Sequence, residues 1–396
     1  MSDFATLLNE YTRRDSPRIH GILAKCYDKN GKEIYSKVSG YESLDPRAAP
    51  LKEDAVFKYT SATKLISSIA LLQCIDDGLI CIDEPLDKIV PELGRRIIKG
   101  LCPQTGDLVI EETQNRITPR HLLTHTSGLA YWFLDPLLMR WKQTAQGSRL
   151  STSLMVHERC DNPLVFEPGQ GWCYGVGLDW AGVIVKRLHG ISLEEYMIEH
   201  IWKPVGLSAP FPTFCISSSA EYQTRLMAGA ERAPDGGLRP YNFWQGDNAV
   251  DQDGGHGLSG TARDWLLVLA DIVSDSPKLL KPETAALMFE PQIEKNSPAM
   301  PMLRQFRPAW ELIAGPVPDD AINHGLGGVL VTEEFAALNQ PRNLLGWGGA
   351  GNTVWFASKE KGVAGFFSTQ LHPFSDPAVK QLVNAWKKDF WSSLPY

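Results

Sequence analysis

The chain has 396 residues, 43% of them hydrophobic and 21% charged; such a composition supports a sizeable core and excludes global disorder. The formal net charge of −7 argues against a broad basic face for nucleic acid. The longest apolar runs fall far short of the ~20 residues of a membrane span, so we expect no nucleic-acid partner and no membrane partner.

The first 45 residues are typical of strands. Residues 21–28 and 33–38 alternate on either side of Asn30-Gly31, a dipeptide that favours a tight hairpin. No apolar stretch follows a basic start, so no secretory signal is visible and we expect a cytoplasmic protein.

The middle of the chain is predicted to be helical. Residues 61–77 repeat apolar side chains at helical spacing and end before Gly78. Further helices are predicted at 120–126, 178–188, 192–200, 262–273 and 282–289. Residues 291–318 contain many prolines and no clear periodicity, which predicts a long loop of the kind that forms a lid or a binding wall.

The end of the chain mirrors its beginning. A second hairpin is predicted from 353–358 and 363–368, followed by a helix over 376–391. We therefore expect an α+β (α/β) fold in which both ends share one antiparallel sheet flanked by helices, with a mostly helical domain inserted between them. The expected sheet domain spans 1–65 and 325–396, the helical domain with long loops spans 66–324, and the active site lies at their interface.

Ser61-Ala62-Thr63-Lys64 is an S-x-x-K motif at the start of the apolar helix. Positions i and i+3 share a helix face, so the Lys64 amine is expected above the Ser61 hydroxyl. The helix N-terminus supplies positive potential that stabilises an oxyanion. The alternative is that Ser61 only caps the helix. A second S-x-x-K begins at Ser358, but there a charged turn indicates a solvated surface.

Two further segments suggest catalytic groups. Tyr174 follows a turn and leads into the helix near residue 178; a phenol near a lysine can act in proton transfer, although a core tyrosine is the alternative. The glycine run at 346–351 enters a strand, where a backbone N–H can serve an oxyanion hole; a β-bulge is the alternative. This run also matches G-x-G-x-x-G, but a strand and not a helix follows it, which argues against a dinucleotide site.

No metal site or cofactor is expected. The seven cysteines are scattered without a C-x-x-C pair and are interpreted as reduced, mostly buried thiols. His121 and His125 lack a third ligand and are expected to serve local structure. Four tryptophans in irregular segments were candidates to line an apolar pocket: Trp132, Trp141, Trp244 and Trp310.

The order of S-x-x-K, a tyrosine and a glycine-rich strand resembles the serine β-lactamase and penicillin-binding-protein superfamily, in particular its class C and esterase branch. Other segments that resemble this branch are residues 121–129, 166–169, 204–207 and 257–262. The chain is also similar to fungal polyketide acyltransferases of the lovastatin side-chain acyltransferase type at residues 61–65, 117–138, 174–182, 348–352 and 370–373. The resemblance covers about residues 20 to 390.

The resemblance implies a β-lactamase/transpeptidase-like fold and a catalytic set of Ser61, Lys64 and Tyr174, with the N–H groups of Ser61 and Ala350 as oxyanion hole. It further implies a substrate pocket, for which the expected residues are Trp347, Gly348, Gly349, Phe374 and Trp310. The chain departs from the lactamase pattern because Val176 replaces the Asn of Tyr-x-Asn and Trp347 replaces the Lys of Lys-Thr-Gly. Phe374 stands where the acyltransferases carry a Trp.

The expected function is a serine acyltransferase of fungal secondary metabolism. It would move an acyl group from a thioester or ester to the hydroxyl of a small polyketide-like acceptor, and the donor would be carried on an acyl-carrier domain of a polyketide synthase. The alternatives are an esterase or other hydrolase of the same fold, a cyclase or dehydratase, and a non-catalytic binding protein that reuses the pocket.

Overall fold

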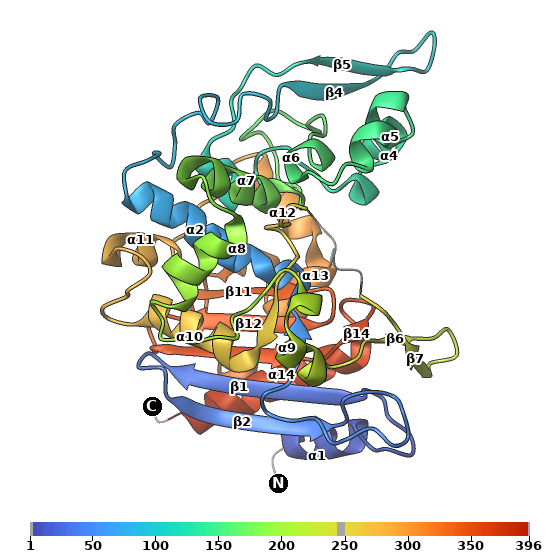
Figure 1. Cartoon of the computed structure of the whole chain (residues 1–396), viewed down its shortest axis with the longest axis vertical. Coiled ribbons are helices and arrows are strands. Elements are labelled where there is room, and N and C mark those ends of the chain that lie inside the picture. The colour runs from blue at the N-terminus through green and yellow to red at the C-terminus, as the bar shows by residue number, and fades with distance from the viewer. Residues whose placement is uncertain (1–2, 244–249, 395–396) are drawn as a thin grey trace.

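The computed structural model describes residues 3–243 and 250–394 of the chain (Figure 1). In this part of the chain, seven strands form a central sheet in which all neighbours are antiparallel. Their order across the sheet is β2 (Glu33–Gly40), β1 (Gly21–Asp28), β13 (Val363–Ser368), β12 (Thr353–Ser358), β11 (Leu344–Gly349), β10 (Val329–Val331) and β9 (Ile322–His324).

Both predicted hairpins are present. The β1–β2 turn contains Gly31 with φ 75°, the left-handed region that glycine enters without strain. The β12–β13 hairpin has the predicted bounds. Because β1 pairs directly with β13, the two ends of the chain share one sheet, as expected.

Helices cover both faces of this sheet. Neighbouring residues of a strand point to opposite faces, and all six residues of β12 are buried. Trp355 packs against Trp265 of α10 (Ala262–Val273), with ring centroids 6.5 Å apart. Phe356 packs at 5.2 Å against Trp386 of α14 (Pro377–Ser393) on the other face, and α1 (Asp3–Tyr11) packs on α14.

The inserted part is built around α2 (Lys64–Asp76), which follows the 3₁₀ turn η1 (Thr60–Thr63). Residues 64–74 of α2 are all buried, as expected for a helix that is apolar all round. It packs against α7 (Gly177–His189) and α8 (Leu193–Met197). The lysine at its start is therefore enclosed on all sides.

The remaining elements form short helices and three small sheets around this frame (Figure 1). The helices are α3 (Pro119–Leu123), η2 (Trp132–Leu134), α4 (Pro136–Lys142), α5 (Ala145–Ser151), α6 (Val156–Arg159), η3 (Ile198–Trp202), η4 (Ile216–Ser218), α9 (Ala220–Arg225), α11 (Pro282–Leu287), α12 (Ala299–Gln305), α13 (Arg307–Ile313), η5 (Asp319–Ala321) and η6 (Ala336–Leu338). Two of the small sheets pair β3 (Val56–Lys58) with β8 (Ser259–Thr261) and β4 (Arg96–Leu101) with β5 (Leu108–Glu112). In the third, β6 (Ala230–Arg232) lies between β14 (Leu371–His372) and β7 (Leu238–Pro240).

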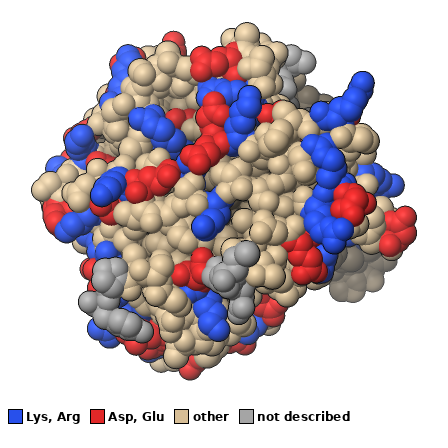
Figure 2. Space-filling view, turned by 90° about the horizontal axis from the view of Figure 1, so that it is seen from below, with Lys and Arg blue, Asp and Glu red and all other residues tan. Residues whose placement is uncertain are grey.

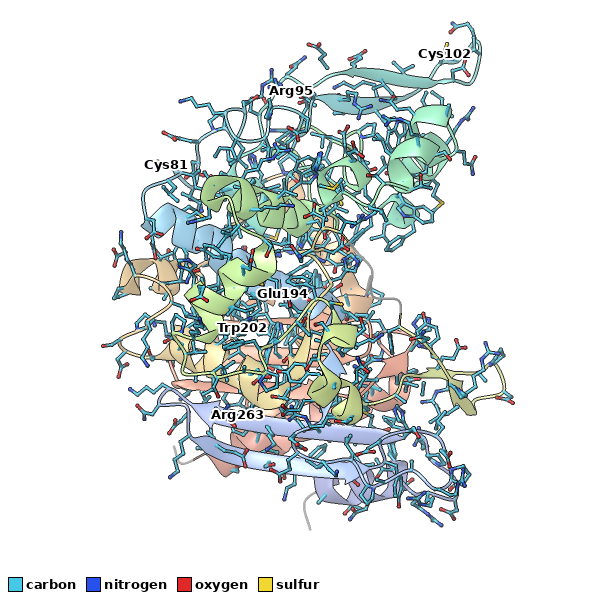
Figure 3. The ribbon with its side chains drawn as sticks, in the orientation of Figure 1. Cys81, Arg95, Cys102, Glu194, Trp202 and Arg263 are labelled. Atoms are coloured by element: carbon cyan, nitrogen blue, oxygen red, sulfur yellow. The ribbon has the colours of Figure 1, made fainter. Side chains whose placement is uncertain are left out.

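Three expectations about the fold were wrong. The segment 291–318 is not one long loop, because it contains α12 and α13. The first 45 residues are not all strand, because α1 begins the described chain. The cysteines are free but not mostly buried, since only Cys26, Cys74 and Cys160 are buried. Figure 3 shows Cys81 and Cys102 on outlying segments, with Cys102 near the tip of the β4–β5 hairpin.

The charge distribution on the surface and the character of the helices bear on nucleic acid and membrane as partners, neither of which the sequence leads us to expect. On the face shown in Figure 2, Lys and Arg side chains are interspersed with Asp and Glu, and no broad single-sign field forms there. Among the helices in the described ranges, none has both the length and the apolar character needed to cross a membrane. The domain boundaries near residues 65 and 325 stay a prediction.

Candidate functional site

Ser61 lies in η1, half-buried, where the chain passes from β3 into α2. The residue before it, Thr60, has φ 49°, which is rare and strained for a β-branched side chain. No side chain caps η1 or α2 through a hydrogen bond, so the structure does not support Ser61 as a helix cap. Strain of this kind persists where the surrounding packing enforces it.

The Lys64 amine lies between two tyrosines. Lys64 is 2% exposed, and its Nζ donates to Tyr131 Oη at 2.9 Å and to the Gly255 carbonyl at 2.7 Å. Nζ also lies 4.8 Å from the centre of the Tyr174 ring and 5.2 Å from that of Tyr131. The structure thus brings Lys64 and Tyr174 together, with Tyr131 as a third member.

Backbone hydrogen bonds join the segments that carry Tyr131 and Tyr174. The Tyr131 N–H donates to the Tyr174 carbonyl at 3.1 Å, and the Val176 N–H donates to the Leu129 carbonyl at 3.2 Å. A Cβ on Gly175 would lie 1.7 Å from the Leu129 oxygen, so only glycine fits between the segments. The two rings meet edge to face, with centroids 5.0 Å apart.

Strand β11 closes the site from the sheet side. A Cβ on Gly349 would lie 2.1 Å from the Tyr59 carbonyl oxygen, so the end of this strand touches the backbone two residues before Ser61. The exposed Ala350 begins the turn that follows Gly349. This contact brings the predicted oxyanion-hole segment close to the segment that carries Ser61.

Aromatic rings form a wall beside Tyr174. The Trp347 ring is 5.6 Å from Tyr174, 5.5 Å from Trp310 and 5.7 Å from His125, on which it stacks at 21°. Phe374 approaches the strand at Gly348, where a Cβ would lie 3.5 Å from its ring. The predicted pocket residues therefore lie near one another around β11.

The four candidate pocket tryptophans have different surroundings. Trp310 is 2% exposed and belongs to α13, where its Nε1 donates to the Leu303 carbonyl at 2.7 Å. Trp141 is buried in α4, in a small separate core, so it is not a pocket residue. Trp132 in η2 is 48% exposed. Trp244 lies outside the described residues.

Two histidines behind the aromatic wall are held neutral. Burial, with the nearby His324 and Lys64, lowers the pKa of His125 well below its ordinary value. Burial likewise lowers the pKa of His324 to about 4. His121 has a local structural role as expected, because its Nδ1 accepts from the Thr118 N–H at the start of α3.

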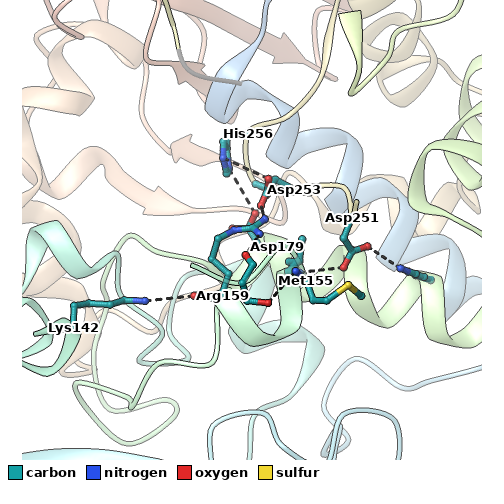
Figure 4. Close-up of polar contacts among 11 residues, drawn as sticks. Lys142, Met155, Arg159, Asp179, Asp251, Asp253 and His256 are labelled. Atoms are coloured by element: carbon teal, nitrogen blue, oxygen red, sulfur yellow. Dashed lines mark hydrogen bonds and ion pairs between the residues drawn. The ribbon is translucent and has the colours of Figure 1, made fainter. Parts of the chain in front are cut away.

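A network of charged side chains surrounds Asp179, and both of its carboxylates, Asp179 and Asp253, are buried (Figure 4). Asp179 Oδ1 accepts from the Gly255 N–H at 2.9 Å and lies 3.7 Å from His256 Nδ1. His256 Nε2 lies 3.9 Å from Asp253, which forms a 2.5 Å ion pair with Arg159. Asp179, Asp253 and His256 have ligand atoms within 4.8 Å of one another, a spacing that can hold a metal ion. Because the Arg159 cation already binds Asp253, the arrangement is better described as an ion-pair network.

Comparison with known proteins places this site in a family. The model of the Beta-lactamase family matches residues 12–385. The chain belongs to the β-lactamase family. It is 54% identical to "Acyltransferase calJ" of Penicillium decumbens over 99% of this chain and 98% of that protein. It is 31% identical to "Lovastatin esterase" of Penicillium rubens over 95% of each.

The fold agrees with this assignment. The structure of unliganded "Simvastatin Synthase (LovD)" from Aspergillus terreus superposes with a TM-score of 0.89, at 30% identity and 99% coverage of both chains. The fold is therefore the β-lactamase/transpeptidase-like one that the sequence predicted. The chain is an enzyme, a serine acyltransferase of the β-lactamase family.

Sequence reasoning missed three members of this β-lactamase-type site: Tyr131, Asp179 and His256. Tyr131 lies two positions after the recognisable residues 127–129, but its partner Lys64 is 67 positions away. Asp179 and His256 meet only because residues 250–258 fold across the start of α7. No local spacing in the sequence signals such contacts.

Proposed function

We propose that the chain moves an acyl group from a thioester or ester to the hydroxyl of a polyketide-like secondary metabolite through an acyl-Ser61 intermediate. The observation that carries the proposal is the position of the Lys64 amine. It lies one helical turn from Ser61, donates a hydrogen bond to Tyr131 and contacts the Tyr174 ring. A buried amine beside a serine and a phenol is suited to moving the proton of an attacking hydroxyl.

In the proposed reaction, Ser61 Oγ attacks the donor carbonyl and its proton passes to Lys64 or Tyr174. The N–H groups of Ser61 and Ala350 stabilise the oxyanion, a contribution of ~10²–10³ in rate per donor. The C–S or C–O bond to the leaving group then breaks, and the leaving group takes the proton. The acceptor alcohol then attacks acyl-Ser61 and gives its proton to Lys64 or Tyr174. The bond between the acyl group and Ser61 Oγ breaks, and Ser61 takes this proton back. These steps use no metal ion and no dissociable cofactor.

Trp347, Gly348, Gly349, Phe374 and Trp310 are the proposed walls of the substrate pocket. Their support is the aromatic cluster around β11 and the absence of side chains on the two glycines. Since Phe374 replaces a Trp of the similar acyltransferases, we propose an acceptor or acyl group of different size. We also propose a cytoplasmic location and an acyl-carrier domain of a polyketide synthase as donor partner.

The main rival is hydrolysis, which the 31% identity to an esterase favours. The two functions differ in what releases the acyl group from Ser61. Short acyl thioesters are mixed with the enzyme, and the adduct is followed by intact-mass spectrometry with and without hydrophobic polycyclic alcohols. Transfer predicts an adduct that persists in buffer and is discharged as an ester by an alcohol. Loss within seconds in buffer, with no ester formed, supports the hydrolase; no adduct at Ser61 contradicts the proposed acyl-Ser61 intermediate.

A further inference from the structure

The contacts of Lys64 determine where its lone pair points. A neutral amine has two N–H donors and one lone pair, and the structure provides two acceptors, Tyr131 Oη and the Gly255 carbonyl. With both donors engaged, the lone pair remains available to accept a proton. A protonated amine has three donors and no lone pair, so its third N–H would point where the proton must be accepted.

Asp179 holds the Gly255 peptide from its other side. Its carboxylate accepts the Gly255 N–H at 2.9 Å, while the carbonyl of the same residue accepts from Lys64 at 2.7 Å. A Cβ on Gly255 would lie 2.4 Å from Asp179 Oδ2, so the carboxylate presses directly against this residue. Asp179 thus acts on Lys64 both through the Gly255 peptide and through its charge.

The negative charge of the buried Asp179 carboxylate opposes a neutral Lys64 amine. Asp179 is 1% exposed, and a negative charge near a buried amine stabilises the protonated amine. The nearest compensating cation is His256, whose Nδ1 lies 3.7 Å from Asp179. Behind it, Asp253 and Arg159 form a second pair of opposite charges. Apart from Lys64, the network therefore contains two carboxylates, the Arg159 guanidinium and the His256 imidazole.

The titration of these groups fits such a balance. Burial alone would lower the pKa of His256, but its contact with Asp179 and the charges of Asp253 and Asp179 raise it above the ordinary value. Burial alone would raise the pKa of Asp179, yet its contact with His256 and the hydrogen bond from the Gly255 N–H bring it below the ordinary value. Each partner thus favours the charged form of the other.

The other titratable and charged groups around Lys64 and the pair also bear on this balance. Among the described residues they are Tyr131, Tyr174, His125, His324, Cys160, Asp253 and Arg159. Burial keeps His125 and His324 neutral by lowering their pKa values, and burial raises the pKa of Tyr131 so that its phenol stays protonated.

We propose that the Asp179–His256 ion pair is a positioning and charge-balancing element that keeps the Lys64 amine available to accept the Ser61 proton. Asp179 fixes the Gly255 carbonyl that orients the amine, and His256 cancels the charge that would otherwise hold a proton on it. The proposal rests on the proposed role of Lys64 in acylation. Neither residue touches the substrate; both act through Lys64.

The test compares three variants, His256→Gln, Asp179→Asn and the double variant, by the pH dependence of Ser61 acylation with a short acyl thioester. In His256→Gln the Asp179 charge is uncompensated. The acidic limb of the pH–rate profile should therefore move up by about one pH unit, with a roughly tenfold loss at pH 7 and recovery at higher pH. In the double variant both charges are gone, and the limb should return to within a few tenths of a unit of the wild-type position.

Asp179→Asn alone should not move the limb upward, because no negative charge remains to hold the proton. This variant fixes the Gly255 peptide less firmly, so the Lys64 amine is less well oriented and the acylation rate should fall at every pH. Asp251→Asn is the matched control: Asp251 is also buried and paired, with Lys186 at 2.8 Å, but it makes no contact with this pair. It should leave the acidic limb in place.

The outcomes separate this proposal from the proposed function. If wild-type enzyme is not acylated at Ser61, the proposed function fails. If it is acylated but His256→Gln leaves the limb unmoved, or the double variant is no closer to wild type than His256→Gln, the charge-balance proposal is wrong. If His256→Gln does not fold, His256→Asn takes its place, and Tm is measured for each protein.

Discussion

At the scale of single residues, the site is defined by a strained threonine followed by a serine. Thr60 keeps φ 49° although its side chain is β-branched, and its Oγ1 donates to the Tyr59 carbonyl at 2.8 Å. Gly349 presses on the same carbonyl. The conformation that presents Ser61 is thus fixed by packing from β11, and we expect the serine to be preorganised for attack.

Ser61→Ala should abolish labelling by a fluorophosphonate or an acyl thioester, because it removes the attacking oxygen. Ser358→Ala is the matched control, since Ser358 begins the second S-x-x-K. That serine is not on a solvated surface as expected; it is fully buried at the end of β12, and its Oγ accepts from the Lys361 N–H. Peptide mapping after labelling checks the site, and a label on Ser358 would contradict the assignment.

The two tyrosines beside Lys64 should differ in their contribution. Lys64→Ala and Tyr174→Phe should each slow acylation by ~10²-fold or more, and combining them should cost much less than the product, because they move the same proton. Tyr131→Phe removes only a hydrogen-bond acceptor of Lys64 and should cost about tenfold or less. Single-turnover acylation rates measure all four variants, and near-normal turnover by Tyr174→Phe would refute its role.

At the scale of secondary structure, the elements predicted correctly are those with strong local signals. The hairpins follow from alternation and an Asn-Gly turn, and α10 has the predicted bounds because its apolar face is regular. Helices α12 and α13 were missed because prolines were interpreted as loop residues, yet Pro298 occupies the N-cap position of α12 and a proline lies in the first turn of α13. Proline fits a helix start, where its missing N–H costs nothing.

The contact between β11 and η1 is the element-level feature on which the site depends. Gly349→Ala places a Cβ where the Tyr59 carbonyl lies, so the strand or the turn must shift. We expect a loss of ~1–3 kcal/mol in the free energy of unfolding and a large loss of Ser61 acylation. Urea unfolding and labelling measure the two effects.

Gly237→Ala is the control for that substitution. Gly237 is exposed, and a Cβ there would meet only its neighbour Asp235, at 3.2 Å from a side-chain oxygen. Stability and acylation should both stay near wild type. If Gly349→Ala were equally harmless, β11 would not position the nucleophile segment.

At the scale of the whole molecule, three buried neutral histidines connect stability to pH. Burial lowers the pKa values of His20 and His324 to about 4, and that of His125 well below ordinary. His20 precedes β1, His324 ends β9 and His125 lies in the inserted part. Protonation therefore acts near both ends of the strand order, beside β1 and at β9, and on the insertion.

These histidines should make the fold sensitive to acid. The unfolded chain binds protons near pH 6.5, whereas the folded chain resists them down to about pH 4. Stability is thus fully present above pH 6.5 and is lost as the pH falls toward 4, by about 1.4 kcal/mol per pH unit for each histidine. Urea unfolding at pH 7, 6 and 5 measures the slope. His20→Gln, remote from the Lys64 site, removes one such group, so its slope should be shallower by one histidine's share. Because carboxylates titrate alike in both proteins, the difference between the curves isolates the imidazole, and parallel curves would show that His20 is not held neutral by the fold.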